Sequence, residues 1–201
     1  MSIYRRMYLC ACPGKQETMY LKRLQALLNA PPKKVVTFNA NEWNLNQLDR
    51  HYADYDKAFF FDFDFHEEEF RQALLGCQKL DRKPGRRFMH AYSSVCFDLW
   101  LLLHKRDYGR VATSCDAYQP EVRKAFGLRP EADIKKESEI KKILDQISLG
   151  DVRGAIRRTS RIREAKLPQD AIRIGKDAYY PNPDFSIHAF LEHVLKDYDG
   201  A

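Results

Sequence analysis

The chain has 201 residues, a length typical of one compact domain with a substantial buried core. Lysine and arginine outnumber aspartate and glutamate by 34 to 28, and the net charge of +6 favours polyanionic partners without the excess of a dedicated polycation. Five cysteines without repeated CxxC pairs exclude a disulfide framework and a zinc ribbon and fit a reducing compartment. No stretch approaches the ~20 apolar residues of a membrane helix, so we expect a cytoplasmic protein without a membrane partner.

Strands and helices alternate through the first half of the sequence. Apolar spacing predicts a strand over Tyr4–Cys12, a turn at Pro13 and Gly14, and a helix from Lys15 onwards. The next expected elements, in chain order, are a strand at 33–39, a helix at 41–54, a strand at 57–64, a helix at 65–77, a strand at 87–93 and a helix at 94–105. This order predicts an α/β fold with a doubly wound, mostly parallel sheet and helices on both faces.

The second half of the chain carries helical patterns separated by glycine and proline, and it has no internal repeat. We expect helices at 131–149, 151–164 and 187–197. The sequence therefore predicts a core over residues 1–118 and a helical C-terminal extension over residues 119–201 that packs on the same domain.

Two aspartates interrupt the apolar third strand, FFFDFD, at its carboxyl end. Residues i and i+2 of a strand share a face, so Asp62 and Asp64 are expected to point the same way, with their backbones roughly 6 to 7 Å apart. At an effective dielectric near 20, two like charges at this spacing repel by roughly 3 kcal/mol, which a divalent cation or a basic side chain would reverse. Because ligands of open α/β sheets bind beyond the carboxyl ends of the strands, the pair is a candidate ligand site.

Two interpretations of these aspartates stay open. In the first, Asp64 forms a capping box with Glu67 at the start of the next helix, and Asp62 accepts hydrogen bonds from the turn after the first strand. In the second, the pair binds a hard cation, Mg²⁺ or Mn²⁺. The segment favours the second, because it carries three more carboxylates at 67–69 and no cluster of cysteine or histidine ligands.

Basic residues form two further candidate sites. Lys15 follows Gly14 at the start of the first helix, where backbone N–H groups and the helix dipole favour an anion such as phosphate. A later helix presents a basic face made by Arg153, Arg157, Arg158 and Arg161. Such a face contacts either solvent or a nucleic-acid backbone. The P-loop pattern GxxxxGK[ST] does not occur, so we do not expect nucleotide hydrolysis by this chain.

Three blocks of the sequence resemble a known family. They are CPGKQETMYLKRL, FFFDFD and SSVCFDLWLLLH, and the last resembles a Ser-Asn-Pro-Cys-Phe-Glu-Leu-Trp-Leu-Leu-Leu-His signature. Together they are similar to the RloB-like (AbiLii-type) family of bacterial restriction and abortive-infection loci. The acidic strand is also similar to that of the Toprim domain, which serves topoisomerases, primases and a class of nucleases.

The resemblance implies a metal-dependent nuclease of anti-phage defence, which acts on RNA or DNA together with an ATPase encoded nearby. Asp62 and Asp64 would be metal ligands, and Asp98, which stands where the signature has a glutamate, would complete the acidic cluster. Pro13 occupies the position of the expected Toprim glutamate, and Glu17, one helical turn away, joins the candidate catalytic set. Pro13 therefore keeps a second hypothesis open, a catalytically degenerate member that binds nucleic acid or a partner protein.

Other residues and folds have weaker functional interpretations. Trp100 is expected to fill the core, and His104 is expected to be a hydrogen-bonded structural histidine. An aspartyl-phosphate receiver-like domain is the last alternative. It would need an acidic pair on the first strand, which carries none.

Overall fold

A computed structural model describes residues 4–31, 34–50, 55–64, 66–82, 87–111 and 113–200. Within these residues, four strands form one parallel sheet in the order β2-β1-β3-β4. They are β1 (Tyr4–Ala11), β2 (Lys34–Asn41), β3 (Asp56–Asp62) and β4 (Phe88–Ser93). The chain moves outward from β1 to β2 and then returns to the other side of β1 for β3 and β4. The topological switch point therefore lies between β1 and β3, where open α/β sheets bind their ligands.

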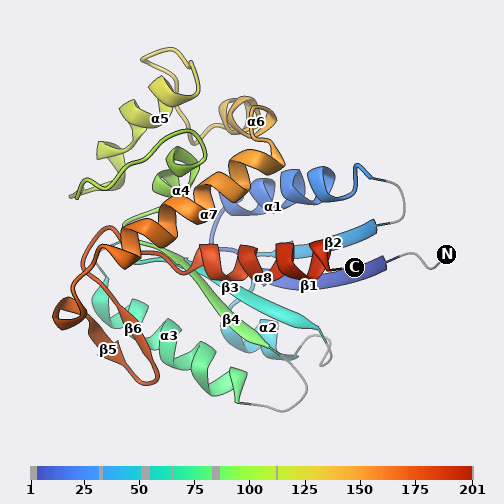
Figure 1. Cartoon of the computed structure of the whole chain (residues 1–201), viewed down its shortest axis with the longest axis vertical. Helices are drawn as coiled ribbons and strands as arrows, with labels where there is room; N and C mark the ends of the chain where they lie inside the picture. The colour runs from blue at the N-terminus through green and yellow to red at the C-terminus, as the bar shows by residue number, and fades with distance from the viewer. Residues whose placement is uncertain are drawn as a thin grey trace.

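Helices cover both faces of this sheet, as Figure 1 shows. One face is covered by α1 (Lys15–Leu28) and α8 (Ile187–Asp199), and the other by α2 (Leu45–Arg50) and α3 (Glu67–Asp81). Successive residues of β1 serve the two faces in turn: Cys10 belongs to the core cluster of α1 and α8, whereas Leu9 packs with residues of α2 and α3. The α/β class and the parallel sheet predicted from the sequence are confirmed.

The remaining helices extend this core. They are α4 (Phe97–Leu103), α5 (Gln119–Ala125), α6 (Glu137–Asp145) and α7 (Leu149–Glu164), with short 3₁₀ turns η1 (Cys115–Ala117) and η2 (Pro168–Asp170). The long helix α7 contacts α1, α4 and α8 (Figure 1). Because α8 packs on β4, the predicted extension shares one hydrophobic core with the sheet, and the boundary at residue 118 stays a prediction. Within the described residues, no helix has the length and apolar content that a membrane span requires.

The second half of the chain differs from the sequence expectation in three ways. The helix expected at 131–149 is shorter, because α6 begins at Glu137 and ends at Asp145, and Ser148 caps the following helix, α7, in a capping box with Asp151. The expectation did not include α5. The sequence also predicted only helices for the extension, but the extension contains a hairpin of β5 (Ile172–Ile174) and β6 (Asp177–Tyr179). This hairpin contacts α3, and its turn includes Gly175 with a φ of 59°. Of the helix expected at 41–54, residues 51–54 lie outside the described residues.

Two buried hydrogen bonds through His104, which we name the relay, join α1 to the end of α4 and hold the two helices together. His104 Nδ1 lies 2.9 Å from the carbonyl oxygen of Trp100, and His104 Nε2 lies 3.1 Å from the Tyr20 hydroxyl. A carbonyl only accepts, so Nδ1–H donates to it and Nε2 accepts the tyrosine proton. Burial lowers the pKa of His104 to about 4, which keeps the ring neutral. The structural interpretations of His104 and of the fully buried Trp100 are confirmed.

We expect Tyr20→Phe to lower the free energy of unfolding by about 1–3 kcal/mol, because it leaves the buried His104 Nε2 without a donor. Urea denaturation followed by tryptophan fluorescence measures this change. Asp170→Asn, at an exposed carboxylate of η2, is the control and should stay within about 0.5 kcal/mol of the original chain. Equal midpoints for the two variants would contradict a stabilising role for the relay.

Candidate active site

A hollow of about 370 Å³ lies at the switch point, beyond the carboxyl ends of β1 and β3. We name it the acidic hollow. Its polar and charged lining residues are Lys15, Gln16, Glu17, Asp62, Asp64 and Lys135. Pro13, at the position of the expected Toprim glutamate, also lines it. The structure thus brings the sequence-predicted residues Lys15, Glu17, Asp62 and Asp64 to one surface, and Asp98 contacts two of the lining side chains.

Asp62 is the last residue of β3 and is half-buried. Its Oδ1 accepts a hydrogen bond of 2.7 Å from the Ser93 hydroxyl at the end of β4. Burial, and after it the nearby Glu17, raise the pKa of Asp62 to about 8, against the lowering effects of Ser93 and Lys135. Without a cation, the carboxyl group therefore keeps its proton near neutral pH.

Asp64 does not share a strand face with Asp62, so the strand expected through residue 64 is wrong. The strand ends at Asp62, and the His66 N–H donates to the carbonyl oxygen of Phe63 to close a turn in which Asp64 has a φ of 34°. The capping box expected for Asp64 and Glu67 is wrong as well, because His66 is the N-cap of α3 and no side chain caps the helix. Asp64 is instead an exposed carboxylate at the mouth of the acidic hollow.

Asp98 lies in the first turn of α4 and is fully buried. Its Oδ1 accepts hydrogen bonds from Gln16 Nε2 at 3.1 Å and from Lys135 Nζ at 2.8 Å. Its Oδ2 is buried and has no hydrogen-bond partner. An unpaired buried carboxylate oxygen is costly in free energy, and a cation or a hydrogen-bond donor would offset this cost.

Glu17 lies in the first turn of α1 with only 6% of its surface exposed. Its carboxylate folds back over the preceding turn, since Oε2 lies 3.0 Å from the point where a side chain on Gly14 would begin. Burial and the nearby Asp98 raise the pKa of Glu17, while Lys135 lowers it. Glu17 therefore places a carboxylate over the turn that contains Pro13.

Lys135 is the member of the acidic hollow that the sequence did not indicate. It precedes α6, and its Nζ contacts both Asp98 Oδ1 at 2.8 Å and Gln16 Oε1 at 2.9 Å. The side chain is 44% exposed, so a positive charge faces the hollow. A lysine in the charged run ADIKKES carries no local signal for such a contact, because the partners lie on α1 and α4.

The predicted basic residues divide between different places. Lys15 lines the acidic hollow and pairs with Glu137 at 2.5 Å. The four predicted arginines, all on α7, do not line it. Arg153 binds both carboxylate oxygens of Asp199 at 2.8 Å, and Arg158 donates to the carbonyl oxygen of Leu103 at 2.9 Å. Arg157 and Arg161 are exposed. As contacts to nucleic acid, these arginines stay predictions.

Two cysteines at the edge of the acidic hollow are joined by a disulfide. They are Cys96, the N-cap of α4, and Cys115, in η1, and both line the hollow. The cysteine count did not predict this bond, and a reducing compartment was expected instead. The other three cysteines, Cys10, Cys12 and Cys77, are free and buried, as expected for small core residues.

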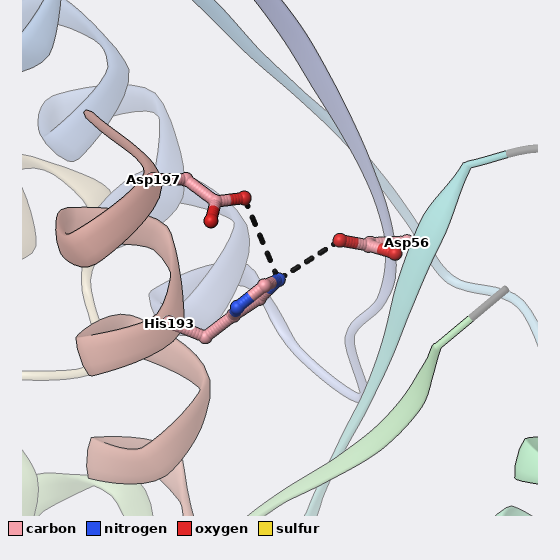
Figure 2. Close-up of side chains that lie close together, drawn as sticks. All are labelled: Asp56, His193 and Asp197. Atoms are coloured by element: carbon pink, nitrogen blue, oxygen red, sulfur yellow. Dashed lines mark hydrogen bonds and ion pairs between the residues drawn. The ribbon is translucent and has the colours of Figure 1, made fainter. Parts of the chain in front are cut away.

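One group of the described residues brings three possible metal ligands close together, and it lies away from the acidic hollow. Figure 2 shows His193 of α8 between Asp197 and Asp56, with Nε2 at 2.8 Å from Asp56 Oδ2 and 3.7 Å from Asp197 Oδ2. Asp56 is the first residue of β3, so it lies at the opposite end of that strand from Asp62. Arg6 pairs with both aspartates, at 3.1 and 3.3 Å. This cluster is therefore an ion-pair network that arginine neutralises.

The acidic hollow offers a different kind of ligand set. Its carboxylates supply the hard oxygen donors that Mg²⁺ and Mn²⁺ prefer. In the part of the chain that the structure describes, they do not form a close group like the one around His193, so ligation requires side-chain movement. The raised pKa of Asp62 and the unpaired Asp98 oxygen both fit a cation at this place.

We expect Asp62→Asn to flatten the pH dependence of stability between about pH 5 and pH 8. The folded chain keeps a proton on Asp62 up to a pKa of about 8, whereas the unfolded chain releases it near 3.8. The unfolded state therefore binds fewer protons, and the free energy of unfolding falls as the pH rises through this window. Relative to the original chain, the variant should gain at least about 1.4 kcal/mol, the equivalent of one pKa unit.

Urea denaturation in EDTA at several pH values measures this difference. Asn keeps an oxygen that accepts from Ser93, so the substitution removes the titration and leaves that hydrogen bond. Asp64→Asn, at the exposed carboxylate of the same hollow, is the control and should retain the slope. If the free energy of unfolding changed with pH equally in the original chain and in Asp62→Asn, the raised pKa of Asp62 would be contradicted.

Comparison with known proteins places this arrangement in a family. Residues 8–193 match the family described as RloB-like protein, a span that runs from β1 through the acidic hollow into α8. Among curated proteins and among solved structures, no match is found. The chain belongs to the family of RloB-like proteins.

Proposed function

We propose that this protein is a metal-dependent nuclease that hydrolyses phosphodiester bonds of RNA or DNA in the cytoplasm. We further propose that it acts as an anti-phage defence effector with an ATPase as its partner. The observation that carries the proposal is the gathering of Glu17, Asp62 and Asp98 at the switch point of the sheet, with one buried carboxylate oxygen unpaired. The Toprim-like order of the sheet supports it, because that edge is where such folds bind ligands.

Asp62 and Asp98 are the residues that would hold the cation, Mg²⁺ or Mn²⁺. The Oδ2 atom of Asp98 has no partner. A cation that binds Asp62 would displace the proton that its raised pKa retains, so that the carboxylate becomes a ligand. Asp64 at the mouth of the hollow would complete the set. When bound, the cation would polarise the phosphodiester group and stabilise its developing negative charge.

Other residues of the acidic hollow would orient the substrate and transfer protons. Lys15 and Lys135 put positive charge beside the place where a phosphate would lie. Glu17, with its raised pKa, holds a proton more readily than an ordinary glutamate, which suits protonation of the leaving oxygen. We infer that Glu17 supplies the carboxyl group that the family pattern has at the position of Pro13.

A catalytically degenerate protein that binds nucleic acid or a partner protein is the second candidate function. Two observations favour it, the proline at position 13 and the ion pair of Lys135 with Asp98. That ion pair already neutralises part of the acidic charge. This candidate predicts weak metal binding and no cleavage.

Cleavage of labelled RNA and DNA in Mg²⁺ or Mn²⁺ separates the two functions. We expect cleavage by the original chain and a loss of more than about 100-fold in rate when Asp62→Ala is combined with Asp64→Ala, because both ligand carboxylates disappear. Asp170→Ala, at an exposed carboxylate of η2, is the matched control and should leave the rate unchanged.

Two outcomes would count against the nuclease. Cleavage that survives in the Asp62 and Asp64 double variant would move the reaction to another site. No cleavage by the original chain, together with cleavage by Pro13→Glu, would establish the degenerate alternative.

A further inference from the structure

A second cavity, of about 490 Å³, opens on the α3 side of the same sheet edge. We name it the aromatic pocket and define it by Phe63, Glu67, Ser94, Tyr179, Tyr180 and Asn182, which are among its lining residues. Its volume lies within the ~300–1,000 Å³ typical of small-ligand sites. The mechanism proposed above does not use it.

The aromatic pocket adjoins the acidic hollow through two short pieces of chain. Phe63 lies between Asp62 and Asp64 in sequence, and its side chain belongs to the cluster on the α3 face, opposite the α1 face. Ser94 directly follows Ser93, the residue whose hydroxyl binds Asp62. A strand of nucleic acid that lies across this edge would therefore meet both cavities within a short length.

The wall of the aromatic pocket is suited to a flat ring. Phe63 and Tyr180 are partly exposed there, whereas Tyr179 is buried and packs against Phe63, with ring centroids 6.3 Å apart and a tilt of 36°. Aromatic faces of this kind stack on nucleobases without regard to sequence. Asn182 and Glu67 add polar groups, which in nucleic-acid sites bind the edges of an unpaired base.

Among the described residues that line the aromatic pocket, Asp184 is the one buried charged group, and an arginine pairs with it. Asp184 accepts from the Tyr92 hydroxyl at 2.6 Å and from the Tyr180 N–H at 2.9 Å, and Arg163 pairs with it at 3.0 Å. The Arg163 guanidinium also lies 5.6 Å from the centre of the Tyr180 ring. Asp184 Oδ1 has no hydrogen-bond partner and is held by the Arg163 ion pair alone, so the floor carries a buried acidic group, which suits a neutral ring better than a phosphate.

The rim of the aromatic pocket carries positive charge that would attract the backbone attached to such a ring. Lys166 Nζ donates to the carbonyl oxygen of Pro181 at 2.8 Å and so lies at the edge of the pocket. The aromatic wall, Lys166 at the rim and the neighbouring acidic hollow are together complementary to an unpaired nucleotide. A lipid or an ordinary peptide would not combine a flat ring for the aromatic wall with a phosphate for the lysine and the acidic hollow.

We propose that the aromatic pocket receives one unpaired nucleobase of the nucleic acid whose backbone lies at the acidic hollow. This proposal rests on the function proposed above and adds that the substrate is single-stranded at this point. Stacking against Tyr180 and its neighbours then contributes to affinity, and it selects unpaired regions over duplex.

A comparison of intact and abasic strands tests the proposal. The probes are fluorescein-labelled random-sequence hexanucleotides and hexamers with all bases removed, in both the ribo and deoxyribo series, measured by fluorescence anisotropy in EDTA. In the series that binds, we expect the intact hexamer to bind about 5- to 150-fold more tightly than the abasic one, the range of one stacked base. Tyr180→Ala should lower the affinity for the intact hexamer and leave that for the abasic hexamer unchanged.

Two control variants and a check of folding complete the design. Tyr180→Trp retains an aromatic face and should restore the discrimination. Tyr55→Ala, at an exposed tyrosine distant from both cavities, should bind like the original chain. Tyr180→Ala keeps the backbone N–H that binds Asp184, and an unchanged urea midpoint verifies its fold.

The results distinguish this proposal from the nuclease itself. Equal binding of intact and abasic hexamers, or an equal loss of both in Tyr180→Ala, would overturn the nucleobase site even if cleavage dependent on Asp62 persists. If the chain neither binds the hexamers nor cleaves nucleic acid, the proposed function fails, and the nucleobase site fails with it.

Discussion

The ion pair between Lys135 and the buried Asp98 is the contact on which the arrangement of the site depends. Removing a carboxylate from water costs several kcal/mol, and Lys135 and Gln16 offset this for only one of its two oxygens. The ion pair also joins the segment before α6 to the start of α4. It therefore ties the C-terminal half of the chain to the carboxyl edge of the sheet, where the other carboxyl groups gather.

Most of the sheet and the position of Asp62 follow from local signals. Alternation and apolar runs identify β1, β3 and β4, and the end of β3 gives Asp62 its place at the ligand-binding edge. The turn at Asp64 was missed because a positive φ at a non-glycine residue leaves no simple pattern. Lys135 was missed because its partners are separated from it by 37 and 119 residues, beyond any local periodicity.

The acidic hollow and the aromatic pocket divide the chemistry of one sheet edge. Asp62 ends β3 with a carboxyl group that lines the acidic hollow, whereas the next residue, Phe63, packs its ring in the cluster on the α3 face. Asp62 and Phe63, at the end of β3, thus line different cavities, the acidic hollow and the aromatic pocket.

The ion-pair network of Asp56, His193 and Asp197 has a consequence for β3. His193 and Asp56 are 137 residues apart in sequence, and α8, which carries the histidine, also covers the face of the sheet that includes Tyr8 and Phe60. Without α8, Tyr8 and Phe60 would lose their contacts with Phe190, and Asp56 would lose its contact with His193. The strand that ends at Asp62 therefore depends, at its other end, on a helix from the last part of the chain.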